Sequence, residues 1–182
     1  MNVIEASCEA LSHVDPYQLL STVRSLQRVQ RDRKARVFCV GNGGGFAHAT
    51  HFASDLTKIV QIPAFSADNI PQLTARINDD GWDSCLANWL AAYHFSHHDA
   101  LFVFSVGGGS DTTSANLTHA INYAHGSWTE AGDSAPLLGI VGAAGGHIAR
   151  YGTPIIVPSF DTPVIEGCQS VIAHQIVEDL CE

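Results

Sequence analysis

The chain has 182 residues, 46% of them hydrophobic, which is long enough to bury a substantial core in one globular domain. Nine lysines and arginines stand against 18 aspartates and glutamates, and the formal net charge of -9 disfavours nucleic acid or an anionic membrane surface as a main partner. An anionic substrate would therefore be held by local donors and dipoles rather than by the overall charge.

The cysteines and the first fifteen residues indicate the cellular compartment of the protein. The five cysteines form no CxxC pair and fall mostly in predicted strands or helices, which favours buried free thiols in a reducing environment over a disulfide framework. The first fifteen residues carry acids rather than a basic segment followed by a long apolar run, and no stretch reaches membrane-spanning length. We therefore expect a cytoplasmic protein with no membrane partner.

The first element with a clear periodicity is an amphipathic helix from Pro16 to Arg31, with Asp15 as its N-cap, because leucines and valines recur there at helical spacing. From Val37 to the end, apolar strand-like runs alternate with helical patterns, which is typical of α/β proteins. A strand is predicted at Val37–Val40, and the further strand candidates are Ala64–Ser66, which is weak, Ala100–Val106, Pro136–Val141 and Pro154–Val157. The further helices are predicted near Trp82–Tyr93, Ser114–Ala124, Gly146–Ala149 and Thr162–Leu180. Together these elements predict a sheet of five mostly parallel strands between helices.

A glycine-rich loop follows the strand at Val37, in the stretch VFCVGNGGGFAHATHFASDL that ends at Leu56. Four glycines around Asn42 would let backbone N–H groups approach an anion, and the helix that follows would point its amino end at the same place. His51 and Asp55 come four residues apart on that helix and therefore share a face. This βα unit predicts a phosphate-type site beside a metal or acid/base pair, although such a His–Asp pair can also be a simple surface interaction.

A second glycine loop, SVGGGSDTTS from Ser105 to Ser114, follows the strongest strand candidate and leads into another helix. Its hydroxyls can supplement backbone donors around an anion. Two such loops at the carboxyl ends of neighbouring strands mark the crevice where open α/β sheets bind ligands, the alternative being two ordinary tight turns. Neither loop has the GxGxxG spacing or the P-loop lysine, so nucleotide binding is disfavoured.

These residues resemble the sugar isomerase (SIS) family and, within it, the phosphoheptose isomerases. Gly41–Asp55 is similar to that family's GNGGS-x-x-x-A-x-H-x-x-x-E/D, and Leu73–Asp83, LTARINDDGWD, is similar to its segment around N-D-x-G. The run FSVGGGS that ends at Ser110 resembles the second phosphate loop in one branch of these isomerases, and Asp161–His174 resembles the helix that completes their active site. The resemblance covers essentially Val37–Leu180.

The resemblance implies a single SIS domain over residues 1–182, with a helical segment at 1–35 and an αβα core at 36–182. The core would be a three-layer, flavodoxin-like αβα sandwich around a central, mostly parallel five-stranded sheet. It further implies a homotetramer with active sites at subunit interfaces, and conversion of sedoheptulose 7-phosphate into D-glycero-D-manno-heptose 7-phosphate. Two alternatives stay open: a non-catalytic SIS protein that binds a sugar phosphate or a partner, and an isomerase of another ketose phosphate.

Carried over position by position, the resemblance assigns His51 to a metal ligand, Asp55 to a catalytic carboxylate, Glu166 to a position often held by Gln, and His174 to the general acid. Asp55 is one methylene shorter than the usual Glu, which retracts the carboxylate, and Gly45 replaces a serine and so removes a hydroxyl. The residues expected to contact substrate or phosphate are Asn42, Gly43, Gly44, Asp79, Ser105, Gly107, Ser110 and Ser114. Asp79 could instead belong to a turn around a glycine.

Taken by their chemistry alone, His51, Asp55, Glu166 and His174 form a set suited to Zn²⁺ and also acceptable to Mn²⁺, Fe²⁺ or Ni²⁺. Glu166 and His174 are eight residues apart, a rise of about 12 Å along one helix. They converge only if Glu166 reaches inward from the start of the helix, if Gln169 is the closer partner, or if the second pair serves a neighbouring subunit. A helix start at Asp161 favours the first of these.

The chemistry expected of this set is aldose–ketose isomerisation through an enediol, with Asp55 or Glu166 as the base and His174 as the acid. A metal bound by a carboxylate lowers its basicity, so base and ligand are competing roles for Asp55. Seven of the other histidines are expected to be packed or solvated, since nothing in the sequence pairs them with a carboxylate at a useful spacing; they are His48, His94, His97, His98, His119, His125 and His147.

Overall fold

The computed structural model describes residues 2–110, 112–130 and 136–182. Its strands form one sheet in the order β2-β1-β3-β4-β5, and all four strand pairs are parallel. The strands are β1 (Val37–Gly41), β2 (Ala64–Ser66), β3 (Ala100–Ser105), β4 (Leu137–Gly142) and β5 (Ile155–Val157). The sequence analysis predicted these strands to within one residue at either end.

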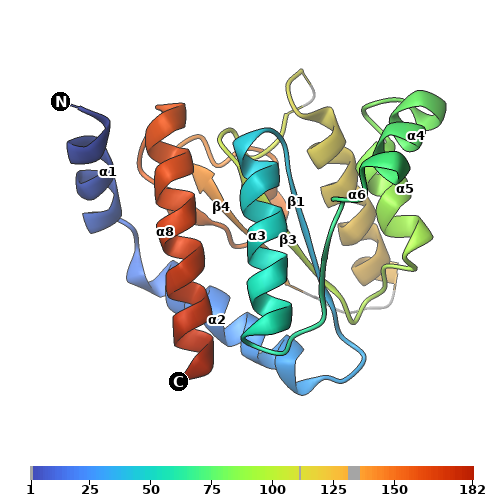
Figure 1. Cartoon of the computed structure of the whole chain (residues 1–182), viewed down its shortest axis with the longest axis horizontal. Helices are drawn as coiled ribbons and strands as arrows, with labels where there is room; N and C mark the ends of the chain where they lie inside the picture. Colours follow the sequence, from blue (N-terminus) through green and yellow to red (C-terminus); the bar gives the residue numbers. More distant parts are fainter. Residues whose placement is uncertain (1, 111, 131–135) are drawn as a thin grey trace.

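Helices cover both faces of the sheet, which gives the predicted three-layer αβα sandwich (Figure 1). One face carries α1 (Val3–Ser12), α2 (Pro16–Arg31), α3 (Gly44–Lys58) and α8 (Thr162–Cys181). The other face carries α4 (Ile70–Asp80), α5 (Cys85–Ala92), α6 (Ala115–Glu130) and α7 (Ile148–Tyr151). The fold is therefore α/β, as predicted.

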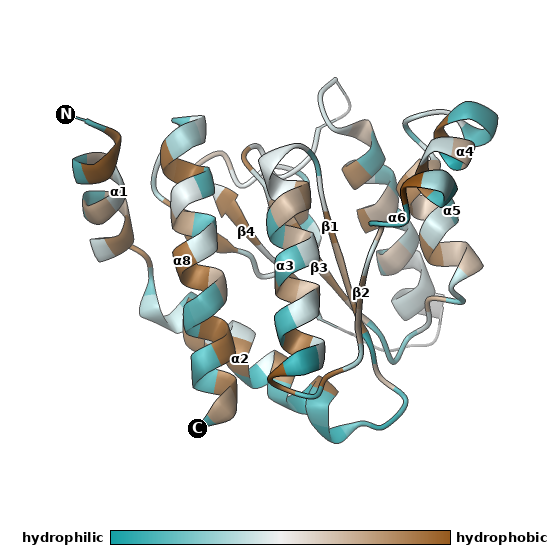
Figure 2. Cartoon of the chain, viewed as in Figure 1, coloured by the Kyte–Doolittle hydropathy of each residue, from teal (hydrophilic) through white to brown (hydrophobic). Residues whose placement is uncertain are grey.

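Alternate strand residues fill the two layers of the core. Phe102 and Phe104 of β3 pack on Phe52 of α3, while Leu101 and Val103 point to the opposite face. Because both faces are covered, every residue of β1, β3 and β4 is buried and these strands are apolar along most of their length (Figure 2). The continuous apolar runs in the sequence have this origin.

Two helices were not predicted, and two were predicted to start too early, one of them the helix expected near Gly146, which begins at Ile148. The helix expected near Trp82 begins at Cys85, and α4 precedes it, with an Asn69 side chain that accepts a hydrogen bond from the Gln72 backbone N–H. The helix α4 ends at Gly81, which has a φ of 81°. The unpredicted α1 is capped by Asn2 and Glu5 in a reciprocal capping box.

An ion pair between a partly exposed arginine and a buried carboxylate joins the starts of two central strands. Arg36, just before β1, donates from Nε and Nη2 to the two carboxylate oxygens of Asp99, just before β3, at 2.9 and 2.8 Å. Asp99 is fully buried, and it also accepts the Ser96 N–H and hydroxyl. The hydrogen bond with Asp99 raises the pKa of Arg36. This network fixes the end of the sheet opposite the glycine loops.

Within the described residues, no helix combines the length and apolar character that crossing a membrane would need.

Candidate active site

The first glycine loop brings the amino end of α3 against the carboxyl ends of β1 and β3. Gly43, the N-cap of α3, has φ 56° and ψ -123°, a conformation that favours glycine. A Cβ on Gly45 would lie 2.5 Å from the carbonyl oxygen of Phe104 in β3. The close packing of its backbone on β3 therefore requires glycine at position 45, in addition to the effect of the missing hydroxyl.

Two asparagines join the first loop to the second through a pair of reciprocal side-chain hydrogen bonds, which we call the clamp. Asn42 donates from Nδ2 to Asn116 Oδ1, and Asn116 donates from Nδ2 to Asn42 Oδ1, both at 2.9 Å. Asn116 stands at the start of α6, is 1% exposed, and also accepts the Leu117 N–H. Sequence reasoning missed Asn116; its only signal was a short polar residue directly after a glycine loop. The side-chain amide of Asn42, predicted to contact phosphate, is engaged in this clamp.

A cavity of about 410 Å³ lies between the two loops. Its described lining residues come from both loops and from the start of α8, and they are Asn42, Gly45, Ser105, Val106, Gly107, Gly109, Ser110, Thr113, Ser114, Thr162 and Glu166. Five of the predicted substrate-binding residues are thus brought together here: Asn42, Ser105, Gly107, Ser110 and Ser114. We call this space the cradle.

Some hydroxyls of the cradle also hold the second loop in shape. Ser105 Oγ accepts the Gly108 N–H at 3.0 Å, and Ser110 Oγ donates to the Thr113 carbonyl at 2.8 Å. Asp79 lies elsewhere: it is exposed in the last turn of α4, accepts a hydrogen bond from Asn78, and is not among the lining residues of the cradle.

Beside the cradle, His51 and Asp55 of α3 meet His174 of α8. His51 Nε2 lies 3.1 Å and His174 Nε2 4.0 Å from Asp55 Oδ2, and one ligand atom from each of the three residues lies within 4.8 Å of the others. Ligands at about 2.1 Å from a tetrahedral Zn²⁺ are about 3.4 Å apart, so small adjustments would let these three atoms hold one ion. Three protein ligands with an open fourth position are typical of catalytic zinc sites. We call these residues the three-ligand group.

The hydrogen bonding of His174 presents the correct nitrogen to this group. Its Nδ1 lies 2.8 Å from the Ser170 carbonyl oxygen, which can only accept, so Nδ1 carries a proton. A neutral imidazole then has its lone pair on Nε2, the atom that faces Asp55. To act as an acid at the same atom, His174 would need a second proton.

Glu166 is not part of the three-ligand group. It is the fifth residue of α8, whose N-cap is Asp161, and its carboxylate lies over the amino end of α3: a Cβ on Gly44 would be 2.5 Å from Glu166 Cδ. Gln169 is also engaged elsewhere, since its buried amide donates to the carbonyls of Ser105 and Ile140. Within this chain, therefore, neither of the two residues considered for completing the ligand set joins it.

His48 is a neighbour of the three-ligand group that sequence reasoning set aside. It lies one turn before His51 and lines, with the three ligands, a cavity of about 270 Å³ between α3 and α8. Burial lowers the pKa of His48, and the negative charge of Glu166 opposes this shift. The available signal was the spacing of three residues from His51, which puts both on one helix face.

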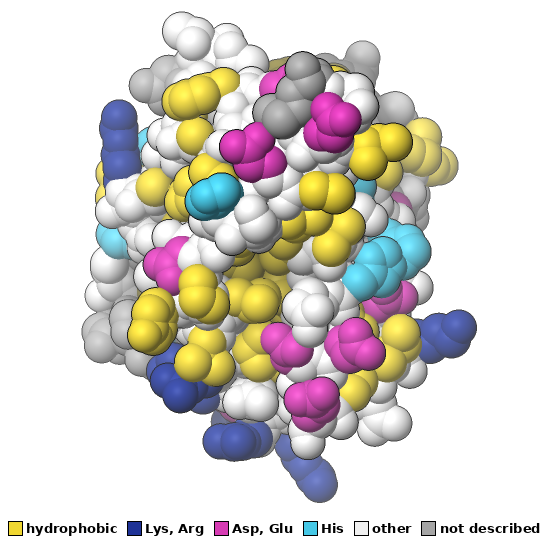
Figure 3. Space-filling model, turned by 90° about the vertical axis from the view of Figure 1, so that its left-hand side faces the viewer, with side chains coloured by type: hydrophobic (Ala, Val, Ile, Leu, Met, Phe, Trp, Pro, Cys, Tyr) yellow, Lys and Arg dark blue, Asp and Glu magenta, His cyan; other side chains and the backbone are white. Residues whose placement is uncertain are grey.

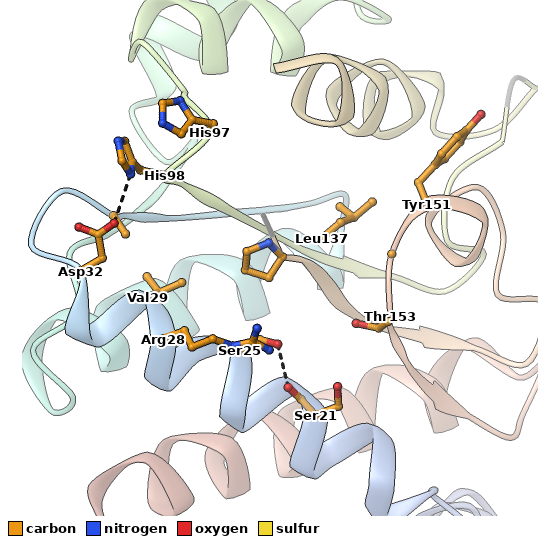
Figure 4. Close-up of a pocket in the computed structure, with 13 residues that line it drawn as sticks. Ser21, Ser25, Arg28, Val29, Asp32, His97, His98, Leu137, Tyr151 and Thr153 are labelled. Atoms are coloured by element: carbon orange, nitrogen blue, oxygen red, sulfur yellow. Dashed lines mark hydrogen bonds and ion pairs between the residues drawn. The ribbon is translucent and has the colours of Figure 1, made fainter. Parts of the chain in front are cut away.

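A larger cavity of about 500 Å³ lies at the other end of the sheet, among α2 and the segments that precede β3 and β5 (Figure 4). His98 pairs there with Asp32 at 3.2 Å, and Ser25 donates to the Ser21 carbonyl. Open parallel sheets bind ligands at the carboxyl ends of their strands, whereas this cavity is at the amino ends. The candidate active site is thus the cradle together with the three-ligand group.

A five-stranded parallel αβα sandwich with two glycine loops and an adjacent histidine–carboxylate group defines a phosphosugar isomerase of the SIS type. No protein-family model matches the chain. It is 34% identical to a phosphoheptose isomerase of Mycobacterium tuberculosis over 151 residues, 79% of this chain and 71% of that protein. It is 35% identical to one of Rhodospirillum rubrum over 156 residues, 80% of this chain and 77% of that protein. The chain belongs to the phosphoheptose isomerase family.

Solved structures agree on the fold. Phosphoheptose isomerase GmhA from Neisseria gonorrhoeae superposes with a TM-score of 0.82 over 98% of this chain and 92% of that one, at 23% identity. The Vibrio vulnificus NanR protein complexed with ManNAc-6P gives 0.69 over 98% of this chain and 58% of that one, at 13% identity. The fold is thus shared by an isomerase and by a protein bound to a sugar phosphate.

Proposed function

We propose that this isomerase interconverts sedoheptulose 7-phosphate and D-glycero-D-manno-heptose 7-phosphate. The observation that supports this most strongly is the three-ligand group beside the cradle, which puts acid/base groups next to an anion-binding space. The relatives named phosphoheptose isomerase supply the choice of sugar.

The phosphate of the substrate would occupy the cradle. Backbone N–H groups at the amino end of α3, next to Gly43 and Gly44, favour an anion there, and the 15-residue helix adds its dipole. Hydroxyls of the second loop, including Ser110 and Ser114, would add donors. Binding energy from the phosphate would then position the reacting carbons, which are remote from it.

Proton transfer would be performed by Asp55 and His174. Asp55, partly buried and next to both histidines, would remove the proton from the carbon beside the carbonyl. His174, protonated at Nε2, would donate to the carbonyl oxygen as the enediol forms. Asp55 is retracted by one methylene relative to glutamate, so the substrate must sit close to α3.

The three-ligand group has the donors that Zn²⁺ takes, and we propose that His51, Asp55 and His174 hold it. A bound Zn²⁺ would polarise the oxygens of the substrate as negative charge develops on them. Coordination and proton transfer compete for Asp55 Oδ2 and for His174 Nε2. A second carboxylate oxygen on Asp55 allows this residue to serve both roles, whereas His174 has only Nε2 to offer and would act as the acid only when no ion is bound to that atom.

We also propose a homotetramer with active sites at its interfaces. Large apolar side chains are exposed on α1 and α8 and near the start of α8, including Ile4 at 77%, Phe160 at 81% and Val171 at 53%. Figure 3 shows hydrophobic side chains spread across the face on which α1 and α8 lie. Light scattering tests the assembly, and a monomer at micromolar concentration would contradict it.

A cytoplasmic location is proposed from the cysteines. Cys39, Cys85 and Cys168 are buried free thiols, and burial raises the pKa of each. Buried thiols without disulfide partners are suited to a reducing compartment. Cell fractionation with an antibody against the protein tests this.

The experiment that tests the function is turnover. Purified protein of known metal content is incubated with sedoheptulose 7-phosphate, and the aldose is followed by NMR, alongside His174→Ala. Turnover that is lost in the variant would support the isomerase and the role of His174. No turnover by zinc-loaded protein would refute the heptose substrate, and other ketose phosphates would then be assayed in the same way.

A further inference from the structure

The positive charges of this acidic chain are concentrated in one short segment. Six of its nine lysines and arginines lie between residues 24 and 36, and they are Arg24, Arg28, Arg31, Arg33, Lys34 and Arg36. The segment runs from the middle of α2 to the start of β1, at the end of the sheet opposite the glycine loops. Most of the Lys and Arg side chains in view in Figure 3 lie at the lower end of the molecule, where Figure 1 shows the end of α2. A local basic surface thus stands against a formal net charge of -9.

This basic segment contains more positive charge than its neighbours neutralise. Arg36 pairs with Asp99, whereas the side chains of the other five cations form no ion pair or hydrogen bond with the described residues. Asp32 is the only acid between residues 24 and 36. Both of its carboxylate oxygens are engaged, because Oδ2 lies 3.2 Å from His98 Nδ1 and Oδ1 accepts the Lys34 N–H at 2.9 Å. An anion that approaches this segment is therefore attracted.

The cavity of about 500 Å³ at the amino ends of the strands lies beside this segment, and we call it the amino-end cavity (Figure 4). Arg28 and Asp32 line it from the end of α2, and His97 and His98 line it from the segment before β3. The two imidazole rings are adjacent, with 4.0 Å between their centroids. Cavities that bind small molecules have volumes of about 300–1,000 Å³, so this one is large enough for such a ligand.

The polar side chains of the amino-end cavity are mainly hydrogen-bond donors. The guanidinium of Arg28 is a planar fork of donors that fits two oxygens of one phosphate group. Either histidine, once protonated, adds a donor and a positive charge, and Asp32 favours the protonated form of His98. Because the two rings are adjacent, protonating both is opposed by repulsion, which an anion between them would offset. The hydroxyls of Tyr151 and Thr153 supply further donors.

The short range of charge interactions in salt favours a small ligand. At physiological ionic strength, interactions between exposed charges are largely screened beyond about 8 Å. A ligand inside the cavity therefore interacts with Arg28, the histidines and the nearby cations, and only weakly with the acidic remainder of the chain. A polymeric anion such as nucleic acid would extend over that remainder. One phosphate group fills a small part of the volume, whereas two linked groups would give oxygens to both Arg28 and the histidines.

We propose that the amino-end cavity is a second binding site of this protein, which takes a small molecule that carries a diphosphate group. Arg28, His97 and His98 would bind the phosphate oxygens, and the buried apolar side chains of Val29 and Leu137 would contact the remainder of the ligand. The site is separate from the cradle, because it lies at the opposite ends of the strands. It does not depend on which sugar phosphate the active site converts.

Calorimetric titration with inorganic pyrophosphate tests the site without requiring turnover. Arg28→Gln keeps a polar side chain and removes the charge, and we expect it to raise the dissociation constant for pyrophosphate by about tenfold or more. Arg31→Gln is the matched control, since Arg31 lies exposed in the same last turn of α2 and does not line the cavity. Its dissociation constant should change by less than about twofold, because the charge that it removes is screened.

Asp32→Asn gives a test that loss of folding cannot imitate. It removes the negative charge that lines the amino-end cavity and keeps a side-chain oxygen to accept from His98 Nδ1. Pyrophosphate should therefore bind about threefold more tightly than to the wild type, or better. Circular dichroism checks that each variant is folded.

Three results would overturn the proposal. The first is a wild type that does not bind pyrophosphate. The second is an Arg28→Gln variant that binds it as tightly as the wild type, or an equal loss in Arg31→Gln; bound pyrophosphate would then lie elsewhere, the cradle included. The third is weaker binding by Asp32→Asn. Turnover of sedoheptulose 7-phosphate is a separate result, since its failure would refute the proposed substrate and leave these affinities unchanged.

Discussion

Replacing Gly45 by the serine of the similar isomerase motif, Gly45→Ser, should destabilise the folded protein. A Cβ on Gly45 would lie 2.5 Å from the Phe104 carbonyl oxygen and 3.1 Å from its carbonyl carbon, and this backbone belongs to β3 at the centre of the sheet. Overpacking against a core that cannot shift costs about 1–3 kcal/mol. The higher helix propensity of serine relative to glycine offsets about 0.5 kcal/mol of this cost.

The net loss expected for Gly45→Ser is therefore about 0.5–2.5 kcal/mol in the free energy of unfolding. For a chain of this length, that corresponds to a fall in Tm of about 1–10 °C. Thermal unfolding followed by circular dichroism measures it. Gly126→Ser is the control, because Gly126 also lies in a helix and an added Cβ there meets nothing within 4 Å.

The reasoning would be refuted if Gly45→Ser were as stable as the wild type or as Gly126→Ser. Such a result would mean that α3 can move away from β3 at little cost. Phosphate binding by Gly45→Ser then becomes informative, because a tolerated serine would add a hydroxyl to the cradle and tighten binding.

Three further predictions concern other parts of the molecule. Asp99→Asn removes a fully buried negative charge that pairs with the partly exposed Arg36, and it should lower the free energy of unfolding in urea by about 3 kcal/mol. Asp80→Asn, in a more exposed pair with a distance of 3.9 Å, should change this free energy by less than about 0.5 kcal/mol, and equal losses would contradict the role given to the Arg36–Asp99 pair. Asn116→Ala leaves the Asn42 amide without its hydrogen-bond partner. It should lower the free energy of unfolding by about 1–3 kcal/mol and raise the KM for sugar phosphate. An unchanged KM would mean that the clamp does not shape the cradle. Burial lowers the pKa of His48 in the folded protein, so the unfolded chain binds a proton at this residue first as the pH falls below about 6.5. The free energy of unfolding therefore falls in that pH range. His48→Asn should lose less of it between pH 7 and pH 5 than the wild type, as measured by urea unfolding at each pH.

The strands and loops were predictable because their signals are local. Apolar runs such as Ala100–Val106 end at glycine clusters, and the periodicity changes from strand to helix at those points. The helix α4, none of whose residues is buried, was not predicted although Asn69 and Pro71 are recognisable start signals; its last turn, with Asp79, was instead interpreted as a possible turn around a glycine. Local signals therefore identified the elements that build the core better than those at its margin.

The candidate site was predictable only in part, because its members meet through tertiary packing. The spacing of His51 and Asp55 on one helix was sufficient to place them together. The rise between Glu166 and His174 indicated that these two converge with difficulty, but the option that the sequence favoured, in which Glu166 reaches inward to complete the ligand set, differs from the group of three that the structure brings together. The relative rotation of α3 and α8 decides which of their side chains meet. It puts His174 beside Asp55 and Glu166 over Gly44. No short-range pattern encodes that rotation.

The exposure of the three-ligand group affects which ion the proposed metal site would hold. The side chains of His51 and His174 are 62% and 57% exposed, so ions in the surroundings reach the group without a conformational change. Nitrogen and oxygen donors bind Ni²⁺ and Cu²⁺ at least as strongly as many competing divalent ions, and so the occupant follows supply as much as preference. If the group is the proposed metal site, chromatography on a nickel resin would therefore load it with Ni²⁺, and protein purified without immobilised metal would carry an ion that the cell provides.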